Sequence, residues 1–446
     1  MRGLRSLIVL LVIAVPLGWY TWRDSQRSAA DDLPKKDKVF AAVEADKIEE
    51  IAVKSESGER TRLQKSGTDW KMVAPATAQP DPSEVSGLAS NLSTLELERV
   101  VDENPPDLKE YGLAQPRIEV AFKSGGKEHT LLIGQKTPPG TDLYAKRADD
   151  KKVFLIPAHL ESTFNKGTFD LRDKAVMKVD RDKLDALEFT AGDRASRFVR
   201  PAGEWQIAAP VQARADFSAI EGLVSRLAGL QMKSIVDAPD ADQKKYGLDK
   251  PEATVKFGSG SSQATLAIGG KAAEGTVYAR DLSRPAIFTI ESNVLDELKK
   301  DPFEYRQKDL FDARSFSATR IEMVRAGQTH VFEKTKTKNK EGQDEEKWRQ
   351  SSPQSRELDQ ASFDKLVSAL TGLRATGFVE APAAAKALAT PELAVTIKFD
   401  EGKKEERVTL AKSGTDAFAS RAGEPGAAKV DAVAIDNAVK ALQELK

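Results

Sequence analysis

The side chains that most often carry chemistry are few in this chain and lie far apart in its sequence. The 446 residues include no cysteine and only three histidines, His129, His159 and His330. Without cysteine there is no thiolate metal site, no disulfide and no cysteine nucleophile. No two histidines have the H-E-x-x-H or H-x-x-x-H spacing of a helical zinc site. The sequence therefore predicts no metal ligands.

Motifs that bind nucleotides or activate a serine are also missing. There is no G-x-x-x-x-G-K-[ST] loop and no G-x-G-x-x-G after a strand. No two glycines are four positions apart, which excludes a G-x-S-x-G nucleophile elbow. Asp240 and Asp242 lack the glycine of a calcium loop. Carboxylate pairs such as Asp170 and Asp173 are unspecific in a chain that is 31% charged. We expect no catalytic residues, no cofactor and no enzymatic activity.

The charge balance bears on the class of partner. The chain has 68 basic and 69 acidic residues and a net charge of −1. Proteins that bind nucleic acid usually carry a basic domain or stripe, and nothing in this composition indicates one. We expect no nucleic-acid partner.

One pattern occurs three times and organises the rest of the chain. A tryptophan is followed eleven positions later by an aspartate: Trp70 and Asp81, Trp205 and Asp216, Trp348 and Asp359. Each aspartate precedes four apolar residues at offsets of three, four and three. These ladders are Val85, Leu88, Leu92 and Leu95; Ile220, Leu223, Leu227 and Leu230; and Phe363, Leu366, Leu370 and Leu373. The spacing is that of one face of a helix, and its recurrence indicates an internal repeat.

The aspartates are predicted to be N-caps, since a carboxylate there accepts a bond from the first helical turn. Pro82 suits the first helical position, and Glu84 completes a capping-box pattern with Asp81. We expect each tryptophan to pack over its helix, with stacking on a ligand as the alternative.

Alternating apolar and polar residues on both sides of each ladder predict short antiparallel strands. Further signatures recur in the first two copies: Tyr111-Gly112-Leu113 and Tyr246-Gly247-Leu248, Tyr144-Ala145 and Tyr278-Ala279, and Arg172-x-Lys174 and Arg306-x-Lys308. Gly112 and Gly247 are expected to take positive φ, and the basic pairs to link one domain to the next. Tyr144 and Tyr278 are interpreted as strand residues, with a groove lining as the alternative. The order of elements predicts three tandem α+β domains.

The third copy has lost the Tyr-Gly pair and carries an insertion, KTKTKNKEGQDEEK. Such a mixed charge run is typical of a solvated loop between strands, with a binding tail as the alternative.

The N-terminus predicts a location. Arg2 and Arg5 precede the apolar stretch LIVLLVIAVPLGWYTW, whose aromatic end resembles an interfacial belt. We expect an uncleaved anchor, with a cleaved signal peptide as the alternative. The predicted divisions are residues 1–5 as a cytoplasmic n-region, 6–22 as a transmembrane signal anchor, 23–37 as a polar tether, and 38–172, 173–307 and 308–446 as repeat domains, the last divergent.

The combined motifs W-x10-D, Y-G-L-x-x-P, I-G followed by Y-A, and R-x-K resemble the bacterial envelope family known as domain of unknown function 4340. The resemblance implies an accessory role beside ABC-type transport systems of the gliding-motility type, and it implies no catalytic residues. We expect a membrane-anchored scaffold or accessory protein at the cytoplasmic (inner) membrane, single-pass, with its bulk in the periplasm and with protein partners. Binding of cell-wall polysaccharide and hydrolysis by paired carboxylates are the alternatives. An aromatic groove would favour glycan, a flat apolar patch a protein, and a deep pocket of carboxylates an enzyme.

Overall fold

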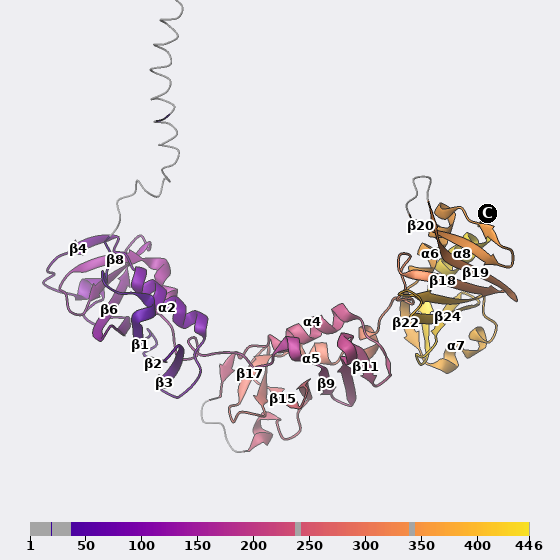
Figure 1. Ribbon diagram of the computed structural model, residues 1–446. Helices are drawn as coiled ribbons and strands as arrows, with labels where there is room; N and C mark the ends of the chain where they lie inside the picture. Colours follow the sequence, from indigo (N-terminus) through magenta and orange to yellow (C-terminus); the bar gives the residue numbers. More distant parts are fainter. Residues whose placement is uncertain (1–18, 20–36, 237–241, 339–343, 446) are drawn as a thin grey trace, which may run out of the picture. The chain divides into compact units, whose positions relative to one another are not determined.

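The computed structural model describes Trp19 and residues 37–236, 242–338 and 344–445 (Figure 1). It divides into two compact units, residues 1–174 and 175–446. The first unit holds one copy of the repeat and the second unit holds two, and each copy has its own sheet. We refer to the copies as repeats 1, 2 and 3.

The sheet of repeat 1 consists of two antiparallel meanders that meet at one central strand pair. Its strands are β1 (Ile48–Lys54), β2 (Arg60–Ser66), β3 (Asp69–Ala74), β4 (Arg99–Asp102), β5 (Ile118–Ser124), β6 (Lys127–Lys136), β7 (Asp142–Arg147) and β8 (Val153–Pro157). Their order is β3-β2-β1-β5-β6-β7-β8-β4, so the chain reaches one edge with β3 and resumes at the opposite edge with β4.

Helix α2 (Pro82–Thr94) makes that crossing and covers one face of the sheet (Figure 1). Its apolar ladder lies in a core with inward side chains of β1, β5 and β6, such as Ile51, Val120 and Ile133. One helix laid across one face of a sheet is what the alternating strand pattern and the helical ladder both require, because each must bury a single apolar face.

Repeat 2 has the same order of elements. Its strands are β9 (Ala186–Ala191), β10 (Arg194–Val199), β11 (Gln206–Ala209), β12 (Ala213–Arg214), β13 (Ser234–Ile235), β14 (Ala253–Ser259), β15 (Ser262–Lys271), β16 (Thr276–Asp281) and β17 (Phe288–Glu291). They form one antiparallel sheet, β12-β11-β10-β9-β14-β15-β16-β17-β13, and helix α4 (Phe217–Ala228) crosses it.

Repeat 3 follows the same plan with two additions. Its strands are β18 (Ala318–Arg325), β19 (Gln328–Lys338), β20 (Asp344–Ser352), β21 (Arg356–Glu357), β22 (Ala375–Val379), β23 (Leu393–Phe399), β24 (Lys404–Ser413), β25 (Asp416–Arg421) and β26 (Ala427–Val430). Helix α6 (Gln360–Thr371) makes the crossing, while α7 (Ala381–Leu388) and α8 (Ala432–Gln443) are added. Ile435 and Leu442 of α8 lie in the same core as the ladder of α6.

The predicted fold class is wrong. The chain is dominated by three large antiparallel sheets of eight, nine and nine strands, and is not the helix-and-strand α+β array that we expected. The sequence showed the long helices clearly, but it showed the edge strands β4, β12, β13 and β21 poorly because they are only two to four residues long.

The predicted N-terminal transmembrane helix is also corrected. Among the residues that the structure describes, no helix has both the length and the apolar content needed to cross a membrane. The apolar stretch 6–22, apart from Trp19, and the tether 23–37, apart from its last residue, lie outside the described residues.

The N-caps are confirmed in all three copies. Asp81 accepts bonds from the N–H groups of Ser83 and Glu84, Asp216 from that of Ala219, and Asp359 from that of Ser362. The ladder residues within the helices are buried, as predicted.

The capping box is wrong, however. The backbone N–H of Asp81 donates to the carbonyl of Leu171, and Glu84 forms an ion pair with Lys166 at 2.9 Å. The turn that contains Leu171 therefore accepts the N–H that Glu84 would have bonded.

The insertion in repeat 3 is an extension of a hairpin, not a loop. β19 and β20 pair from Phe332 opposite Gln350 out to Lys338 opposite Asp344, and residues 339–343 lie outside the described residues. Lys336 lies opposite Glu346, so charges of opposite sign meet across the strands. Such cross-strand pairs stabilise a sheet.

Candidate functional site

The Tyr-Gly, Ile-Gly and Tyr-Ala signatures form one structural contact. Gly112 and Gly247 have φ of 68° and 67°, as predicted. A Cβ on Gly134, in the Ile-Gly pair, would lie 2.1 Å from the carbonyl oxygen of Tyr111. Tyr111 also meets Tyr144 edge-on, with ring centroids 5.2 Å apart. The motif that we considered as a groove lining therefore holds a turn against the sheet.

Repeat 2 makes the same contact, and repeat 3 replaces it. A Cβ on Gly269 would lie 2.2 Å from the carbonyl oxygen of Tyr246, and Tyr246 meets Tyr278 at 5.1 Å. In repeat 3, helix α7 takes the place of the turn. Its Ala384 packs in a small cluster with Ala411 and Phe418. Repeat 3 therefore lacks the Tyr-Gly pair and has a helix where repeats 1 and 2 have the turn.

The tryptophans pack against the crossing helices, as predicted, although to different extents. Trp205 is 4% exposed, and its Nε1 donates to Glu221 of α4 at 2.7 Å. Trp348 is 6% exposed and lies 4.9 Å from the ring of Phe363. Trp70 is only half-buried at the margin of its core. One indole therefore keeps an accessible surface.

A basic residue comes before each tryptophan in the sequence, on the neighbouring strand or directly after that strand. The side chain of this basic residue lies differently in the three repeats. Arg200 lies over the ring of Trp205 at 5.6 Å, and Lys334 over that of Trp348 at 5.4 Å. The corresponding Lys65 is paired with Trp70 in the strand register, yet its Nζ donates to the carbonyl of Asp46 at 2.8 Å. Within the described part of the chain, no cation lies over Trp70.

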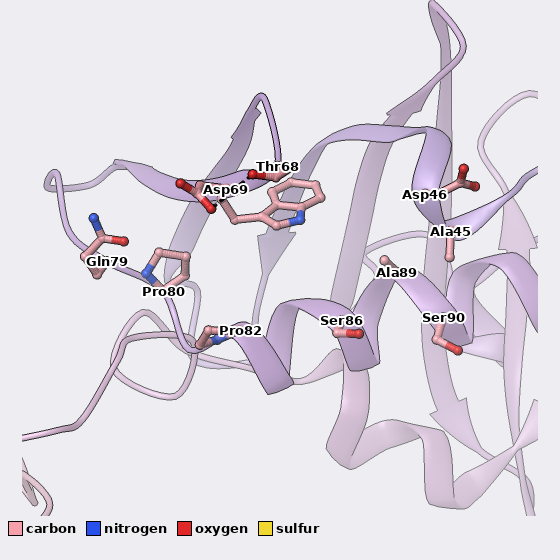
Figure 2. Close-up of a pocket in the computed structure, with 11 residues that line it drawn as sticks. Ala45, Asp46, Thr68, Asp69, Gln79, Pro80, Pro82, Ser86, Ala89 and Ser90 are labelled. Carbon is pink, nitrogen blue, oxygen red and sulfur yellow. Dashed lines mark hydrogen bonds between the residues drawn. The ribbon is translucent and has the colours of Figure 1, made fainter. Parts of the chain in front are cut away.

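A cleft of about 520 Å³ opens beside Trp70, and we call it the Trp70 cleft. Its sides come from the start of β3, from the segment that leads into α2, and from one face of α2 (Figure 2). The residues lining it are Ala45, Asp46, Thr68, Asp69, Trp70, Gln79, Pro80, Pro82, Ser86, Ala89 and Ser90. Small side chains on α2 leave the space, and Pro80 and Pro82 hold the chain rigidly at its rim.

The charge of the Trp70 cleft is negative. Asp46 and Asp69 are exposed, and neither carboxylate forms an ion pair with another described residue, although Asp69 accepts the hydroxyl of Thr68 at 3.5 Å (Figure 2). An indole beside two carboxylates without ion-pair partners, a carboxamide and three hydroxyls offers cation–π contact, charge and hydrogen bonds together. This set suits a cation carried on an apolar stem, and it also suits a sugar.

Repeat 2 has the same cleft at the same sequence positions. Trp205 follows Trp70 by 135 positions, and six lining residues correspond at that offset. Thr68, Asp69, Trp70, Gln79, Pro80 and Pro82 correspond to Gly203, Glu204, Trp205, Arg214, Ala215 and Phe217. This Trp205 cleft, of about 690 Å³, has a second wall made by repeat 3, which comprises Asp312, Phe399, Lys404, Glu405 and Arg421.

In repeat 3 a side chain spans the equivalent place. Gln360 follows the cap Asp359, as Pro82 follows Asp81. Its amide donates to the carbonyl of Trp348 and accepts from the N–H of Trp348, both at 3.0 Å. At this position, the cleft of repeat 1 is lined by its own residues, the cleft of repeat 2 has a second wall from repeat 3, and in repeat 3 a glutamine bridges the place.

A cluster of arginines and carboxylates, the junction cluster, lies beside the Trp205 cleft. It consists of Arg214 and Arg306 from repeat 2 and Asp312, Glu406, Arg421 and Glu424 from repeat 3. Glu424 accepts from Arg214 at 2.6 Å and from Arg306 at 2.9 Å. Arg306 is 4% exposed and also stacks on Phe378 at 4.0 Å. In this copy the Arg-x-Lys motif joins two repeats, as predicted.

The other sequence candidates do not come together. His129 packs against Phe40 and Phe122, His159 lies in a short 3-10 helix, and His330 stacks on Phe332. Burial lowers the pKa of His330, which keeps it neutral near pH 7. In the described ranges, no three histidine, aspartate or glutamate side chains form a metal-binding group.

The carboxylates that we singled out have local roles where they are described. Asp170 accepts the N–H of Gly167 in a turn, and Asp242 caps a 3-10 helix by accepting the N–H of Lys244. Asp240 lies outside the described residues.

Sequence reasoning found Trp70 but missed the acidic members of its cleft. Asp46 comes from a 3-10 turn before β1 and Asp69 from the strand start, so only the folded sheet places them near α2. A signal was present in the doublets Asp69-Trp70 and Glu204-Trp205, where an acid precedes the indole in both copies.

The repeat architecture agrees with the comparisons between this chain and known families. The chain belongs to the family Domain of unknown function (DUF4340), which matches residues 70–204 and 205–394. The first match begins at Trp70 and the second at Trp205, so both start at the tryptophan of a cleft. No curated protein matches the chain.

Solved structures of a DNA polymerase sliding clamp from Pseudomonas aeruginosa align over most of the length. One, with a ligand, is 9% identical and covers 88% of this chain and 93% of that chain, with a TM-score of 0.17. Another, described as the DNA polymerase III subunit beta, is 9% identical and covers 87% and 92%, with a TM-score of 0.16. Scores this low do not bear on the fold or the function of this chain.

Proposed function

We propose that this chain is an accessory protein that binds protein partners through the tryptophan clefts of its repeats. The observation that carries the proposal is the Trp205 cleft, where one wall of the cleft is another protein domain. The same six positions line the Trp70 cleft, so repeat 1 presents the same kind of surface. Within its own unit, residues 1–174, the described lining of this cleft comes from repeat 1 alone.

The cellular setting of this proposal rests on the N-terminal sequence and on the family. Arg2, Arg5 and the apolar residues after them direct the rest of the chain to the outer side of the cytoplasmic membrane. The family resemblance implies a role beside ABC-type transport systems of the gliding-motility type. We therefore propose an envelope scaffold that works with such a transport complex.

Glycan binding is the second candidate, and the composition of the Trp70 cleft favours it. An indole with Gln79, Ser86 and Ser90 nearby has the polar and aromatic groups that bind sugar rings. The protein neighbour across the Trp205 cleft is the reason to place protein binding first.

The test is crosslinking in intact cells with the full chain carrying a C-terminal affinity tag. We expect the chain in the envelope fraction and crosslinked to components of a transport complex. A tagged chain that fractionates with the cytoplasm, or a C-terminal reporter that is active only there, would overturn the proposal. Saturable hydrolysis of a cell-wall substrate, lost in Asp46→Asn, would favour the carboxylate-dependent hydrolase instead.

A further inference from the structure

We propose that the Trp70 cleft binds a basic segment of a partner protein, in which a lysine or arginine lies beside an apolar side chain. The inference rests on the proposed function, because it names the chemistry of the partner that repeat 1 would hold. It follows from three observations, which are the wall that repeat 3 adds to the counterpart cleft, the carboxylates without ion-pair partners and the indole without a cation over it.

The counterpart in repeat 2 shows what kind of surface lies across such a cleft. The wall that repeat 3 contributes to the Trp205 cleft contains the ring of Phe399, two cations, Lys404 and Arg421, and two acids, Asp312 and Glu405. Within repeat 3, Lys404 pairs with Asp400 and Arg421 with Asp312. Asp400 raises the pKa of Lys404 most, and Glu204 in the wall of repeat 2 raises it further. A lysine and an aromatic residue of repeat 3 therefore line the same cleft as an acid and an indole of repeat 2.

Repeat 1 retains the acidic side of this arrangement. Asp69 stands at the position of Glu204, and Asp46 adds a second carboxylate, whereas Glu204 is the one acid among the residues that repeat 2 contributes to the Trp205 cleft. Arg214, which fills part of the repeat 2 cleft with positive charge, is replaced by the neutral Gln79. The Trp70 cleft is therefore the more negative of the two, and it lacks the cations that balance its counterpart.

The indole of Trp70 adds a second reason to expect a cation. Arg200 and Lys334 lie over the other two tryptophans, whereas Lys65 is bonded to the carbonyl of Asp46. A lysine or arginine from outside can therefore reach the π face of Trp70. The surrounding Pro80, Pro82 and Ala89 offer apolar contact to its aliphatic stem.

Fluorescence anisotropy with labelled decapeptides tests this chemistry on the purified full chain. One probe alternates lysine with phenylalanine, a second replaces each lysine with glutamate, and a third replaces each phenylalanine with serine. We expect the first to bind best and to weaken with added salt, since surface charges are screened. Equal binding of the lysine and glutamate probes would overturn the inference.

Variants assign the binding to the cleft. The double variant Asp46→Asn with Asp69→Asn keeps the shape of the cleft and removes its charge, so the lysine–phenylalanine probe should bind at least about tenfold more weakly, or about 1.4 kcal/mol. Glu110→Gln, an exposed acid elsewhere in repeat 1, is the matched control and should change nothing. Trp70→Phe keeps an aromatic ring, and it is used because Trp70→Ala would remove a ring that packs against the core. This variant should weaken binding of the probe less than the double variant does. Unchanged affinity in the double variant would place the probe elsewhere and contradict the inference.

A photocrosslinking residue in place of Ser86, which is exposed on α2 and lines the cleft, separates the inference from the proposed function. We expect it to capture an envelope protein at a segment rich in lysine or arginine. If tag-based crosslinking finds envelope partners but the residue at 86 captures none of them, the cleft inference fails while the proposed function stands. If the lysine probe binds the cleft but no envelope partner is found, the proposed function fails and the cleft chemistry stands. Binding of a cell-wall oligosaccharide that Trp70→Phe weakens and the double aspartate variant does not would replace the peptide with a glycan.

Discussion

Gly134 lies directly against the carbonyl oxygen of Tyr111, so closely that a Cβ on this glycine would come within 2.1 Å of that oxygen. The same relationship holds between Gly269 and Tyr246, at 2.2 Å. The Tyr-Gly and Ile-Gly motifs are more than twenty residues apart in sequence, and they recur together because the first requires the second. The turn with its left-handed glycine can rest on the sheet only where the strand lacks a side chain.

Substitution of Gly134 by alanine should therefore destabilise repeat 1. The new methyl group would meet the backbone of Tyr111 first, and the backbone cannot give way as a flexible side chain can. The turn must therefore move, and overpacking of this kind costs about 1–3 kcal/mol. Gly87→Ala is the matched control, since a Cβ there meets nothing within 4 Å and alanine is favoured inside a helix. Chemical unfolding of a chain that begins at Asp37 should show a lower midpoint for the first variant and an equal or higher one for the second.

The sequence predicted what depends on local spacing and missed what depends on pairing over distance. The cap aspartates and the buried ladders were predicted because a helix is read from residues three and four apart. The short edge strand β13 (Ser234–Ile235) has no pattern of its own and exists because β17 offers it a partner. The Trp70 cleft escaped prediction for the same reason, since Asp46 and Ser86 meet only through the folded sheet.

The extended hairpin of repeat 3 shows a further limit of sequence reasoning. A run of mixed charge predicts a solvated loop, yet Thr335 and Thr337 are β-branched and alternate with lysines. In the strand register, Glu346 then lies opposite Lys336 and Asp344 opposite Lys338, while Glu345 lies opposite Thr337. Charges of opposite sign therefore face each other across the paired strands. The sequence alone does not predict this pairing, because it does not give the register of the strands.

Truncation of one ladder leucine in each helix should weaken its own repeat. Leu92, Leu227 and Leu370 are fully buried, and replacing such a leucine by alanine costs about 2–5 kcal/mol through lost burial and the cavity that remains. Unfolding followed by hydrogen exchange should place the loss of protection in the repeat that carries the change. Equal loss across all three repeats, or no loss at all, would contradict the assigned cores.

Neutralising Glu424 should loosen the connection between repeats 2 and 3. This carboxylate, 13% exposed, accepts from both Arg214 and Arg306, and Arg306 is nearly buried. Glu424→Gln leaves these arginines with a weaker acceptor, and removing one partner of a buried ion pair costs about 3 kcal/mol. We expect the unfolding of residues 175–446 to separate into two transitions.

Glu444→Gln is the control for the junction cluster. Its pair with Lys440 spans 3.8 Å between two exposed side chains, and such surface pairs contribute little. A single cooperative transition in Glu424→Gln, with an unchanged midpoint, would show that the junction cluster does not couple the repeats.

The last prediction concerns the pH dependence of repeat 1. Hydrogen bonding to Lys136, and then to Arg117, lowers the pKa of Glu161 from 4.5, and Arg117 likewise lowers that of Glu56. Because these carboxyl groups have lower pKa values in the folded chain than in the unfolded chain, their contribution to stability is complete above about pH 4.5 and is lost as the pH falls through the lowered values. The difference in unfolding free energy between the native chain and Glu161→Gln should therefore be constant from pH 7 to about pH 5 and should shrink toward zero below pH 4.5. Glu110→Gln, an exposed acid in the same repeat, should not change the pH profile in this way. Urea unfolding at a series of pH values measures the difference, and a gap that widens on acidification would show that the Arg117 pairs do not stabilise the fold.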